Sequence, residues 1–282
     1  MRIASSCVAF AAAFCLSSAA CAQTGAVAAM AEARAASRRG DEDAALSAWA
    51  RVLAAPDATL SMKGEALDAT ASYQFLVKHD LDAAVSAMDA AVALFPSDPH
   101  YLTLRGVYRT TAGQPAQGLA DLDEAVRAAP GSSLIRRGRG FTLLHLGRFE
   151  EAAAEMRLAL KAEDYSPFLP LELHVVRMRT GVDDRIEFEA NTERFDPKVW
   201  PGPIVAFYRG DLAAEAVIAA ADASPSADRT GNLCEAYYFI GQAATAAGEL
   251  AKAKGLFEQA VAICPFDFTE GAGAKAELSR MR

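Results

Sequence analysis

The sequence predicts an all-helical solenoid, a row of helical hairpins in which each hairpin packs on its neighbours. A period of 34 residues runs through the middle of the chain, and no segment shows the apolar–polar alternation of a β-strand. The composition is 52% hydrophobic and 23% charged, which excludes general disorder, and alanine, a strong helix former, contributes much of the apolar share. We expect about six or seven hairpins.

Residues 1–22 predict an export signal rather than a part of the fold. Arg2 gives a short basic start, residues 3–16 are apolar, and small residues follow them. Cleavage before Gln23 is the simplest interpretation of this pattern. It would leave 27 basic and 36 acidic residues, so the net charge would change from −8 to 27 − 36 = −9.

Cys21 offers a second interpretation of the same segment, because a bacterial lipoprotein is acylated on a cysteine at this position. Ser18 departs from this pattern, since a lipobox usually has leucine there. Both interpretations predict an exported protein of the periplasm. The chain would be soluble in one case and anchored to a membrane by lipid in the other.

Similar residues recur every 34 positions in the middle of the chain. One column holds a turn glycine, a second a small residue of the first helix, and a third an apolar residue of the second helix. These columns are Gly113, Gly147 and Gly181 with His79 before them, Ser72 with Gly106 and Gly140, and Met88 with Leu122 and Met156. The small residue lets two helices approach closely, and the glycine ends the first helix in a left-handed turn. Each period therefore predicts one helical hairpin.

The periods divide the chain after the signal into three regions. N-terminal units fill residues 23–166, degenerate helix pairs fill residues 167–233, and a last unit with an end helix fills residues 234–282. The N-terminal units are expected at about 26–59, 65–98, 99–132 and 133–166. In the degenerate region we expect helices at 168–180, 182–195 and 204–209, and a further helix capped by Asp211. Residues 269–282 are expected to form a solvating end helix.

This hairpin unit resembles the tetratricopeptide repeat (TPR). The irregular region and the closing unit are more specifically similar to NlpI-type TPR lipoproteins of bacterial envelopes. The segments that carry this likeness are WPGPIVAFYRG at residues 200–210 and EAYYFIG at residues 235–241. Pro201 and Pro203 depart from the family pattern. The resemblance implies a non-catalytic adaptor that gathers peptidoglycan hydrolases and a periplasmic protease, and it implies a homodimer.

Cys234 and Cys264 are expected to form a disulfide. Cys234 opens the first helix of the last hairpin and Cys264 closes the second, so an antiparallel pair brings them together. Export would also place them in an oxidising compartment. The alternative is two separate buried cysteines.

The first helices of stacked hairpins line a concave face, so their outward positions predict a binding groove. The candidate positions are Tyr73, Thr103, Val107, Thr110, Arg137, Phe141, Leu144, His145, Val175, Tyr238 and Gln242. An apolar surface with scattered hydrogen-bond donors suits a peptide or a helix of a partner. About half of these residues are expected to pack between neighbouring hairpins instead.

Arginines recur beside the small-residue column of the first helices. Arg105 and Arg139 lie one period apart and are expected to make contacts between hairpins. Arg136 and Arg137 join Arg139 in the densest basic cluster of the sequence, which faces either solvent or an acidic partner.

Motifs for catalysis, metals and cofactors are not found in the sequence. The four histidines lie at different repeat positions, and none lies three or four residues from another as in a zinc-binding helix. Residues 138–140 read Gly-Arg-Gly but lack the strand and the further glycine of a dinucleotide loop. The net charge of −8 argues against nucleic-acid binding. We expect no catalytic residue, no metal, no cofactor and no nucleic-acid partner.

The sequence thus predicts a non-catalytic exported adaptor that binds other envelope proteins or peptides through its groove. The alternative is a structural subunit of an outer-membrane assembly or secretion complex. An enzyme built on the same repeats is a third interpretation, which the missing motifs disfavour.

Overall fold

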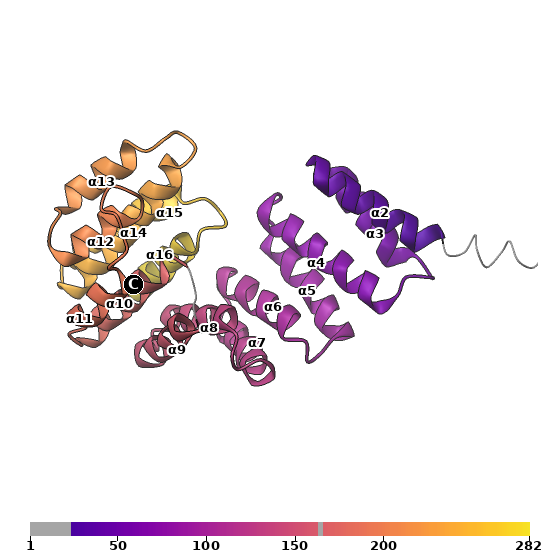
Figure 1. Cartoon of the computed structure of the whole chain (residues 1–282), viewed down its shortest axis with the longest axis horizontal. Helices are drawn as coiled ribbons and strands as arrows, with labels where there is room; N and C mark the ends of the chain where they lie inside the picture. Colours follow the sequence, from indigo (N-terminus) through magenta and orange to yellow (C-terminus); the bar gives the residue numbers. More distant parts are fainter. Residues whose placement is uncertain (1–23, 163–165) are drawn as a thin grey trace, which may run out of the picture.

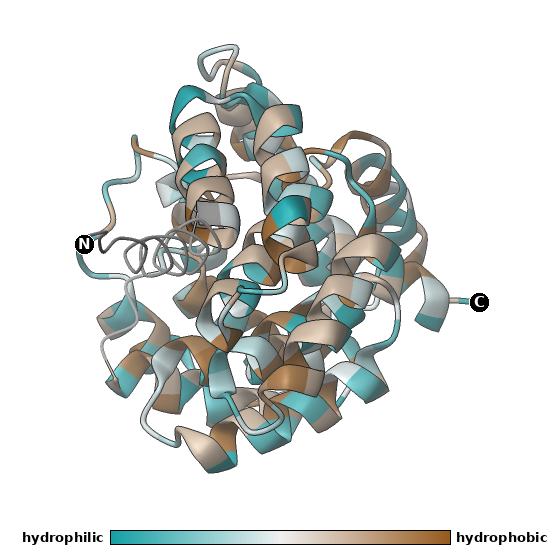
Figure 2. Cartoon of the chain, turned by 90° about the vertical axis from the view of Figure 1, so that its right-hand side faces the viewer, coloured by the Kyte–Doolittle hydropathy of each residue, from teal (hydrophilic) through white to brown (hydrophobic). Residues whose placement is uncertain are grey.

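The computed structural model describes residues 24–162 and 166–282, so the predicted export signal and Cys21 lie outside the described residues. Within these two ranges the chain forms fifteen helices and no strand. The predicted all-helical solenoid is therefore confirmed. Hydrophobic and hydrophilic residues are mixed along the same helices (Figure 2), as expected when each helix has one packed and one solvated face.

Four hairpins follow one another along an arc in the first half of the chain (Figure 1). They are α2 (Thr24–Arg39) with α3 (Glu42–Ala54), α4 (Leu60–Leu76) with α5 (Leu81–Leu94), α6 (Pro99–Thr111) with α7 (Pro115–Ala128), and α8 (Ser133–His145) with α9 (Phe149–Lys161). The last two hairpins start where the period places them, whereas α4 begins ahead of the unit expected from residue 65.

The turn between the two helices of a hairpin uses a residue with positive φ. Gly113 has a φ of +78° and Gly147 a φ of +73°, a conformation that costs glycine nothing because it has no Cβ. His79 occupies the same column of the repeat and has a φ of +55°. The turn geometry therefore persists even where the repeat lacks glycine.

Helices α6 and α7 meet at two facing glycines. A Cβ added to Gly118 would lie 2.5 Å from the carbonyl oxygen of Gly106, and one added to Gly106 would lie 2.9 Å from the carbonyl oxygen of Gly118. Both distances are below ordinary van der Waals contact. The small-residue column of the sequence thus marks the closest approach within this hairpin.

The second half of the chain is less regular and forms the other arm of the arc (Figure 1). Its helices are α10 (Leu169–Thr180), α11 (Arg185–Asn191), α12 (Gly202–Arg209), α13 (Ala214–Asp222), α14 (Arg229–Ala246), α15 (Leu250–Ile263) and α16 (Thr269–Arg280). Helix α11 is shorter than the segment 182–195 expected from the sequence.

The expected cap of α13 by Asp211 is wrong. The N-cap residue is Ala213, which makes no side-chain cap. Asp211 instead completes the C-terminal turn of α12, where Gly210 is left-handed and the backbone N–H of Asp211 donates to the carbonyl of Ala206 at 2.9 Å. A tight helix end therefore uses the residue that the sequence pattern assigned to the next helix start.

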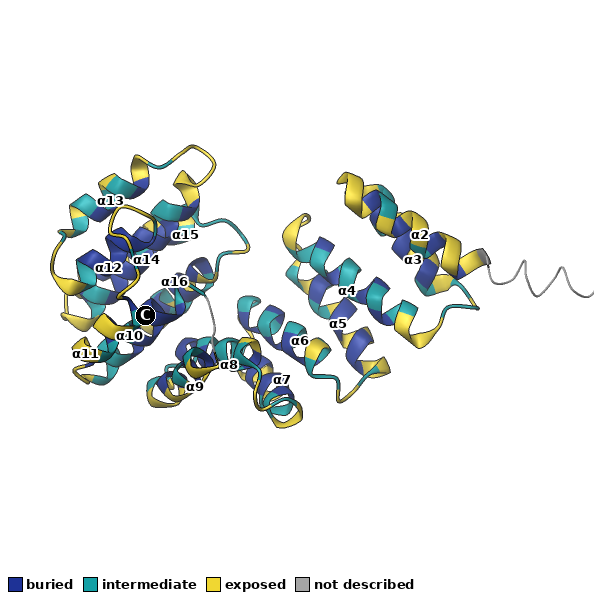
Figure 3. Cartoon of the chain, viewed as in Figure 1, coloured by how far each residue is buried: buried dark blue, intermediate teal, exposed yellow. Residues whose placement is uncertain are grey.

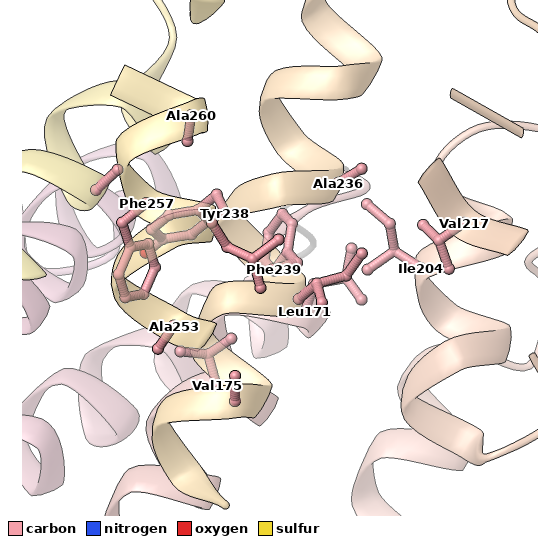
Figure 4. Close-up of a cluster of buried hydrophobic side chains, with 14 of the residues drawn as sticks. Leu171, Val175, Ile204, Val217, Ala236, Tyr238, Phe239, Ala253, Phe257 and Ala260 are labelled. Atoms are coloured by element: carbon pink, nitrogen blue, oxygen red, sulfur yellow. The ribbon is translucent and has the colours of Figure 1, made fainter. Parts of the chain in front are cut away.

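A large hydrophobic core holds the second half together. Figure 4 shows side chains from several helices meeting there, among them Leu171, Ile204, Phe239 and Phe257, all fully buried. In the first half the buried residues form smaller clusters between successive hairpins, and Figure 3 shows them along the packed sides of the paired helices. Stacked hairpins bury apolar surface only against neighbours, whereas the last helices share one core.

Two further features tie the C-terminal end in place. Cys234 of α14 and Cys264 after α15 form a disulfide with their Cα atoms 4.8 Å apart, which confirms the predicted pairing. Helix α16 is also more than a solvating end, because Arg280 Nη1 donates to the carbonyl of His145 on α8 at 2.8 Å. The buried Glu277 of α16 pairs with Arg179 of α10 at 2.8 Å.

Candidate binding cavity

A cavity of about 470 Å³ lies between α6, α8 and α10 on one side and α14, α16 and the loop before α16 on the other. Apolar side chains form much of its wall. They are Leu104, Val107, Leu134, Phe141, Phe168 and Phe268. Helices α6 and α8, the first helices of the two central hairpins, thus face α16 near the end of the chain across this space (Figure 1).

The loop between α15 and α16 reaches from the last hairpin to the second one. The ring of Phe266 stacks on His79 with 4.7 Å between centroids and lies 5.5 Å from the ring of Phe75. Asp267 and Phe268 of the same loop line the cavity. One wall of the cavity is therefore held by aromatic contacts to α4 and to the turn after it.

Five of the eleven positions proposed from the sequence line this cavity. They are Thr103, Val107, Thr110, Arg137 and Phe141. That these residues bind a partner stays a prediction, but the structure does bring them together around one space.

The other six positions lie outside the cavity. Tyr73 packs against α3, where its hydroxyl donates to Asp43 Oδ1 at 2.5 Å. Leu144, Val175 and Tyr238 are buried in the hydrophobic clusters, and buried Gln242 donates to Glu277 Oε1 at 3.2 Å. These side chains pack between helices, the alternative that the sequence left open for about half of the set.

His145, the sixth, is buried beneath α16. Burial lowers the pKa of His145 to about 4, and the charge of the nearby Arg280 guanidinium contributes to the same shift. Its Nε2 has no hydrogen-bond partner among the described residues. The imidazole is therefore neutral at neutral pH and is not presented to the cavity.

The threonines of the cavity wall use their hydroxyl groups within their own helices. Thr103 donates to the carbonyl of Pro99 at 2.5 Å, and Thr142 donates to the carbonyl of Gly138 at 2.9 Å. Thr110 donates to Gly106 at 2.8 Å in the same way. Because each hydroxyl hydrogen is used in a bond to the preceding turn, these side chains have no hydroxyl donor left for a ligand.

Three buried acids that no sequence motif marks also line the cavity. Glu172 and Glu235 are each 6% exposed and Glu270 is 5% exposed. Burial, followed by the charge of Glu270, raises the pKa of Glu235 to about 8, although the hydrogen bond from Trp200 Nε1 opposes this. Burial likewise raises the pKa of Glu270. The predicted disulfide was the signal that could have located one of them, because Glu235 follows Cys234 directly.

The arginines of the first helices form a repeated network between hairpins. Arg105 pairs with Asp89 at 3.0 Å and with Asp121 at 2.6 Å, so it joins α5, α6 and α7. One period later, Arg139 pairs in the same way with Asp123 at 2.6 Å and Glu155 at 2.9 Å. This geometry agrees with the expected contacts between hairpins.

The basic cluster of α8 is largely bound within the fold. Arg136 Nη1 pairs with Glu155 at 2.9 Å, beside Arg139 on the same carboxylate. Arg137 lines the cavity and also has an interaction partner. The structure thus gives Arg136 and Arg139 structural partners rather than a solvated face.

Neither metal ligation nor membrane spanning is indicated in the part of the chain that the structure describes. Over residues 24–162 and 166–282, no three or more His, Cys, Asp or Glu side chains are grouped to hold a metal ion. Within the same ranges, every helix is too short or too polar to cross a bilayer.

Comparison with known proteins agrees with this architecture. Tetratricopeptide-repeat family models match residues 70–133 and 109–167, and another matches residues 235–267. These matches show that the chain contains tetratricopeptide repeats. They cover the chain from within α4 to the end of α9 and the last hairpin, and neither the first hairpin nor the irregular helices α10 to α13.

Solved structures with similar folds include a tetratricopeptide repeat protein from Parabacteroides merdae, at 15% identity, with 89% of this chain and 98% of that chain covered and a TM-score of 0.58. The MamA protein matches at 13% identity over 64% of this chain and 100% of its own, with a TM-score of 0.53. The C-terminal part of a repeat-containing protein from Cytophaga hutchinsonii matches at 14% identity, covering 86% and 98%, with a TM-score of 0.51. At such identities the similarity shows the fold alone.

Proposed function

We propose that this tetratricopeptide-repeat chain is a non-catalytic adaptor, exported to the periplasm, which binds envelope proteins through the cavity on its inner face. The observation that carries the proposal is the cavity of about 470 Å³ with walls of leucine, valine and phenylalanine. Concave sites of this kind, mostly apolar with a few placed polar groups, suit an inserted peptide or helix.

The repeat architecture supports a scaffolding role. A row of hairpins offers an extended surface, and a protein that holds two partners raises the concentration of each near the other without any chemistry of its own. The likeness to NlpI-type lipoproteins motivates peptidoglycan hydrolases and a periplasmic protease as the partners.

Affinity capture with paired leucine variants tests this function. Leu134 lines the cavity and is 58% exposed, whereas Leu158 is 41% exposed on α9 and is not among the lining residues. We expect detergent-solubilised envelopes to yield a cell-wall hydrolase or protease with the unchanged chain and with Leu158→Asp. Capture should fall at least about tenfold with Leu134→Asp, since a buried charge opposes apolar docking.

Two results would contradict the proposal. Recovery of no hydrolase or protease would exclude these partners, and equal capture by both variants would exclude the cavity as the docking site. A fixed partner at one-to-one ratio would instead indicate the structural subunit of a larger complex.

Export is tested separately by the mass of the mature N-terminus. A chain that begins at Gln23 would be soluble, and a chain that begins at an acylated Cys21 would be tethered. A chain isolated from its native cell with residues 1–22 intact would contradict export.

The homodimer implied by the resemblance is also part of the proposal. Exposed apolar side chains on the N-terminal helices, Val27 at 59% and Leu60 at 58%, supply a surface for it. Light scattering coupled to gel filtration should give twice the mass of one mature chain, and the mass of a single chain at every concentration would contradict it.

A further inference from the structure

The polar groups that the cavity can offer to a partner are mainly carboxylates. Thr103, Thr110 and Thr142 of the wall donate to carbonyls of their own helices. Arg137, Ser166 and Glu172 have interactions as well. Glu235 and Glu270 are left within the cavity, with the exposed Asp267 beside them.

Glu235 and Glu270 are buried carboxyl groups that line the same cavity. Neither carboxylate pairs with any Lys, Arg or His of residues 24–162 and 166–282. Glu235 Oε2 accepts the indole N–H of Trp200, and its other oxygen accepts no hydrogen bond from the described residues. Among the side chains of the described residues, only the Thr269 hydroxyl donates a hydrogen bond to the Glu270 carboxylate, at 3.2 Å to Oε2. Buried carboxylates usually have a cationic or strongly donating partner, because burial otherwise opposes their charge.

We propose that the cavity binds a segment of a partner protein that inserts a lysine or arginine side chain between Glu235 and Glu270. This inference rests on the proposed function, namely that the cavity docks a protein segment. The apolar neighbours of the inserted residue would pack on Phe141, Phe168 and Phe268 of the wall.

The chemistry of the site favours a basic side chain over a metal ion. The described residues hold no group of three or more metal-ligating side chains, whereas a lysine or arginine needs only one or two carboxylates. Its aliphatic stem packs on apolar surface while its charged head reaches the acids, and an aromatic wall adds a cation–π attraction. Asp267, exposed in the loop at the cavity, would attract the same charge during approach.

The protonation state of Glu235 gives the inference a measurable consequence. With its pKa raised to about 8 by burial and by Glu270, this carboxyl is mostly protonated at pH 7. An inserted cation would lower that pKa, so binding would release a proton. The other charged groups that line the cavity are Glu172 of α10, Arg137 of α8 and Asp267 of the loop.

Peptide selection on the purified chain tests the inference directly. We would select random 12-residue peptides displayed on phage, synthesise the enriched ones with a fluorescent label, and measure their affinities by fluorescence anisotropy. We expect a lysine or arginine flanked by apolar residues in the enriched peptides. The double variant Glu235→Gln/Glu270→Gln should bind them at least about tenfold more weakly.

Matched variants separate this effect from damage to the fold. Glu150→Gln/Glu151→Gln removes two exposed acids from the start of α9 and should leave the affinity unchanged. Glutamine at position 235 retains an oxygen for the Trp200 indole, and circular dichroism should confirm that each variant is folded. Calorimetry in two buffers of different ionisation enthalpy should detect proton release with the unchanged chain and less release with Glu235→Gln.

The outcomes distinguish the inference from the function on which it rests. Bound peptides without a basic residue, or equal affinity of the Glu235→Gln/Glu270→Gln variant, would overturn the inference and leave a peptide-binding adaptor. Binding of free arginine as tight as that of the peptides would overturn docking of a segment. Enrichment of no peptide, together with unchanged capture by Leu134→Asp, would overturn both.

Discussion

Glu235 is the residue whose chemistry the fold changes most. It lies on α14 beside the disulfide, faces Glu270 of α16 across the cavity, and accepts the indole N–H of Trp200. In the sequence it stands among apolar and aromatic residues of a helix and has no acidic neighbour within several positions. Its surroundings come from three separate segments, so no local pattern could predict them.

Other residue-scale features were predictable because they repeat. The left-handed glycines and Arg105 with Arg139 recur with the period, and one geometry therefore serves several hairpins. The cavity-lining members of the groove set were predictable for the same reason. The remaining members were not, since whether a first-helix residue faces the cavity or a neighbouring helix depends on how the surrounding helices pack against it.

The pH dependence of stability tests the raised pKa of Glu235. The folded value of about 8 lies above the ordinary value of 4.5, so between these pH values the folded chain binds more protons than the unfolded chain. The resulting stabilisation is complete below pH 4.5 and is lost as the pH rises to about 8. Relative to Glu235→Gln, the unchanged chain should lose about 2–4 kcal/mol of unfolding free energy over this range.

Urea unfolding of both chains at pH 5, 6, 7 and 8 would measure this difference. Titrating groups remote from Glu235 are common to the two chains and cancel in the comparison, whereas Glu270, whose charge interacts with Glu235, contributes to the difference. Parallel stability curves would show that the carboxyl of Glu235 is not perturbed.

The facing glycines of α6 and α7 give a second test at the same scale. Gly118→Ala should lower the unfolding free energy by about 1–3 kcal/mol, because its Cβ would lie 2.5 Å from the carbonyl oxygen of Gly106. The control is Gly255→Ala on α15, where no atom lies within 4 Å and alanine should stabilise the helix by about 0.5–1 kcal/mol. Equal effects of the two substitutions would contradict the close approach.

Helix boundaries show what the pattern of a single element can and cannot predict. The regular hairpins follow from the period, because each carries its own turn and small-residue signals. The start of α13 does not, since Asp211 serves the end of α12 instead of the helix that follows. The disulfide was predictable from topology alone, because the two ends of an antiparallel hairpin must meet.

Removing the disulfide tests how strongly the last hairpin depends on it. The double variant Cys234→Ser/Cys264→Ser opens a loop with a sequence separation of 30 residues. The unfolding free energy should fall by about 3–4 kcal/mol on the loop-entropy model. Guanidinium unfolding of the unchanged chain with a reductant provides the control, since it should show a similar loss. No loss in either experiment would contradict a structural disulfide.

On the scale of the whole molecule, the end of the chain returns to its first half. Phe266 contacts Phe75 and His79, and Arg280 bonds to His145, although these partners lie far apart in the sequence. A repeat pattern predicts only contacts between neighbouring hairpins, so it predicted the arc and missed this closure. The cavity depends on the closure, because the loop that carries Phe266 also forms its wall.

Phe266→Ala tests the closure. Loss of two aromatic contacts should raise amide hydrogen exchange in the loop before α16 and around the turn after α4, while α2 and α3 keep their rates. Phe149→Ala is the control, because its ring contacts Arg179 rather than this loop. Unchanged exchange at both ends of the Phe266 contact would contradict the closure.

Site-specific photocrosslinking in cells that express the chain tests the central claim most directly. A photoreactive phenylalanine analogue would replace Phe141 in the cavity wall or, as the control, Leu158 on the exposed side of α9. The account predicts discrete protein adducts from position 141 and none of the same adducts from position 158. Adducts from position 158 alone, or identical adducts from both positions, would contradict an adaptor that binds its partners through the cavity.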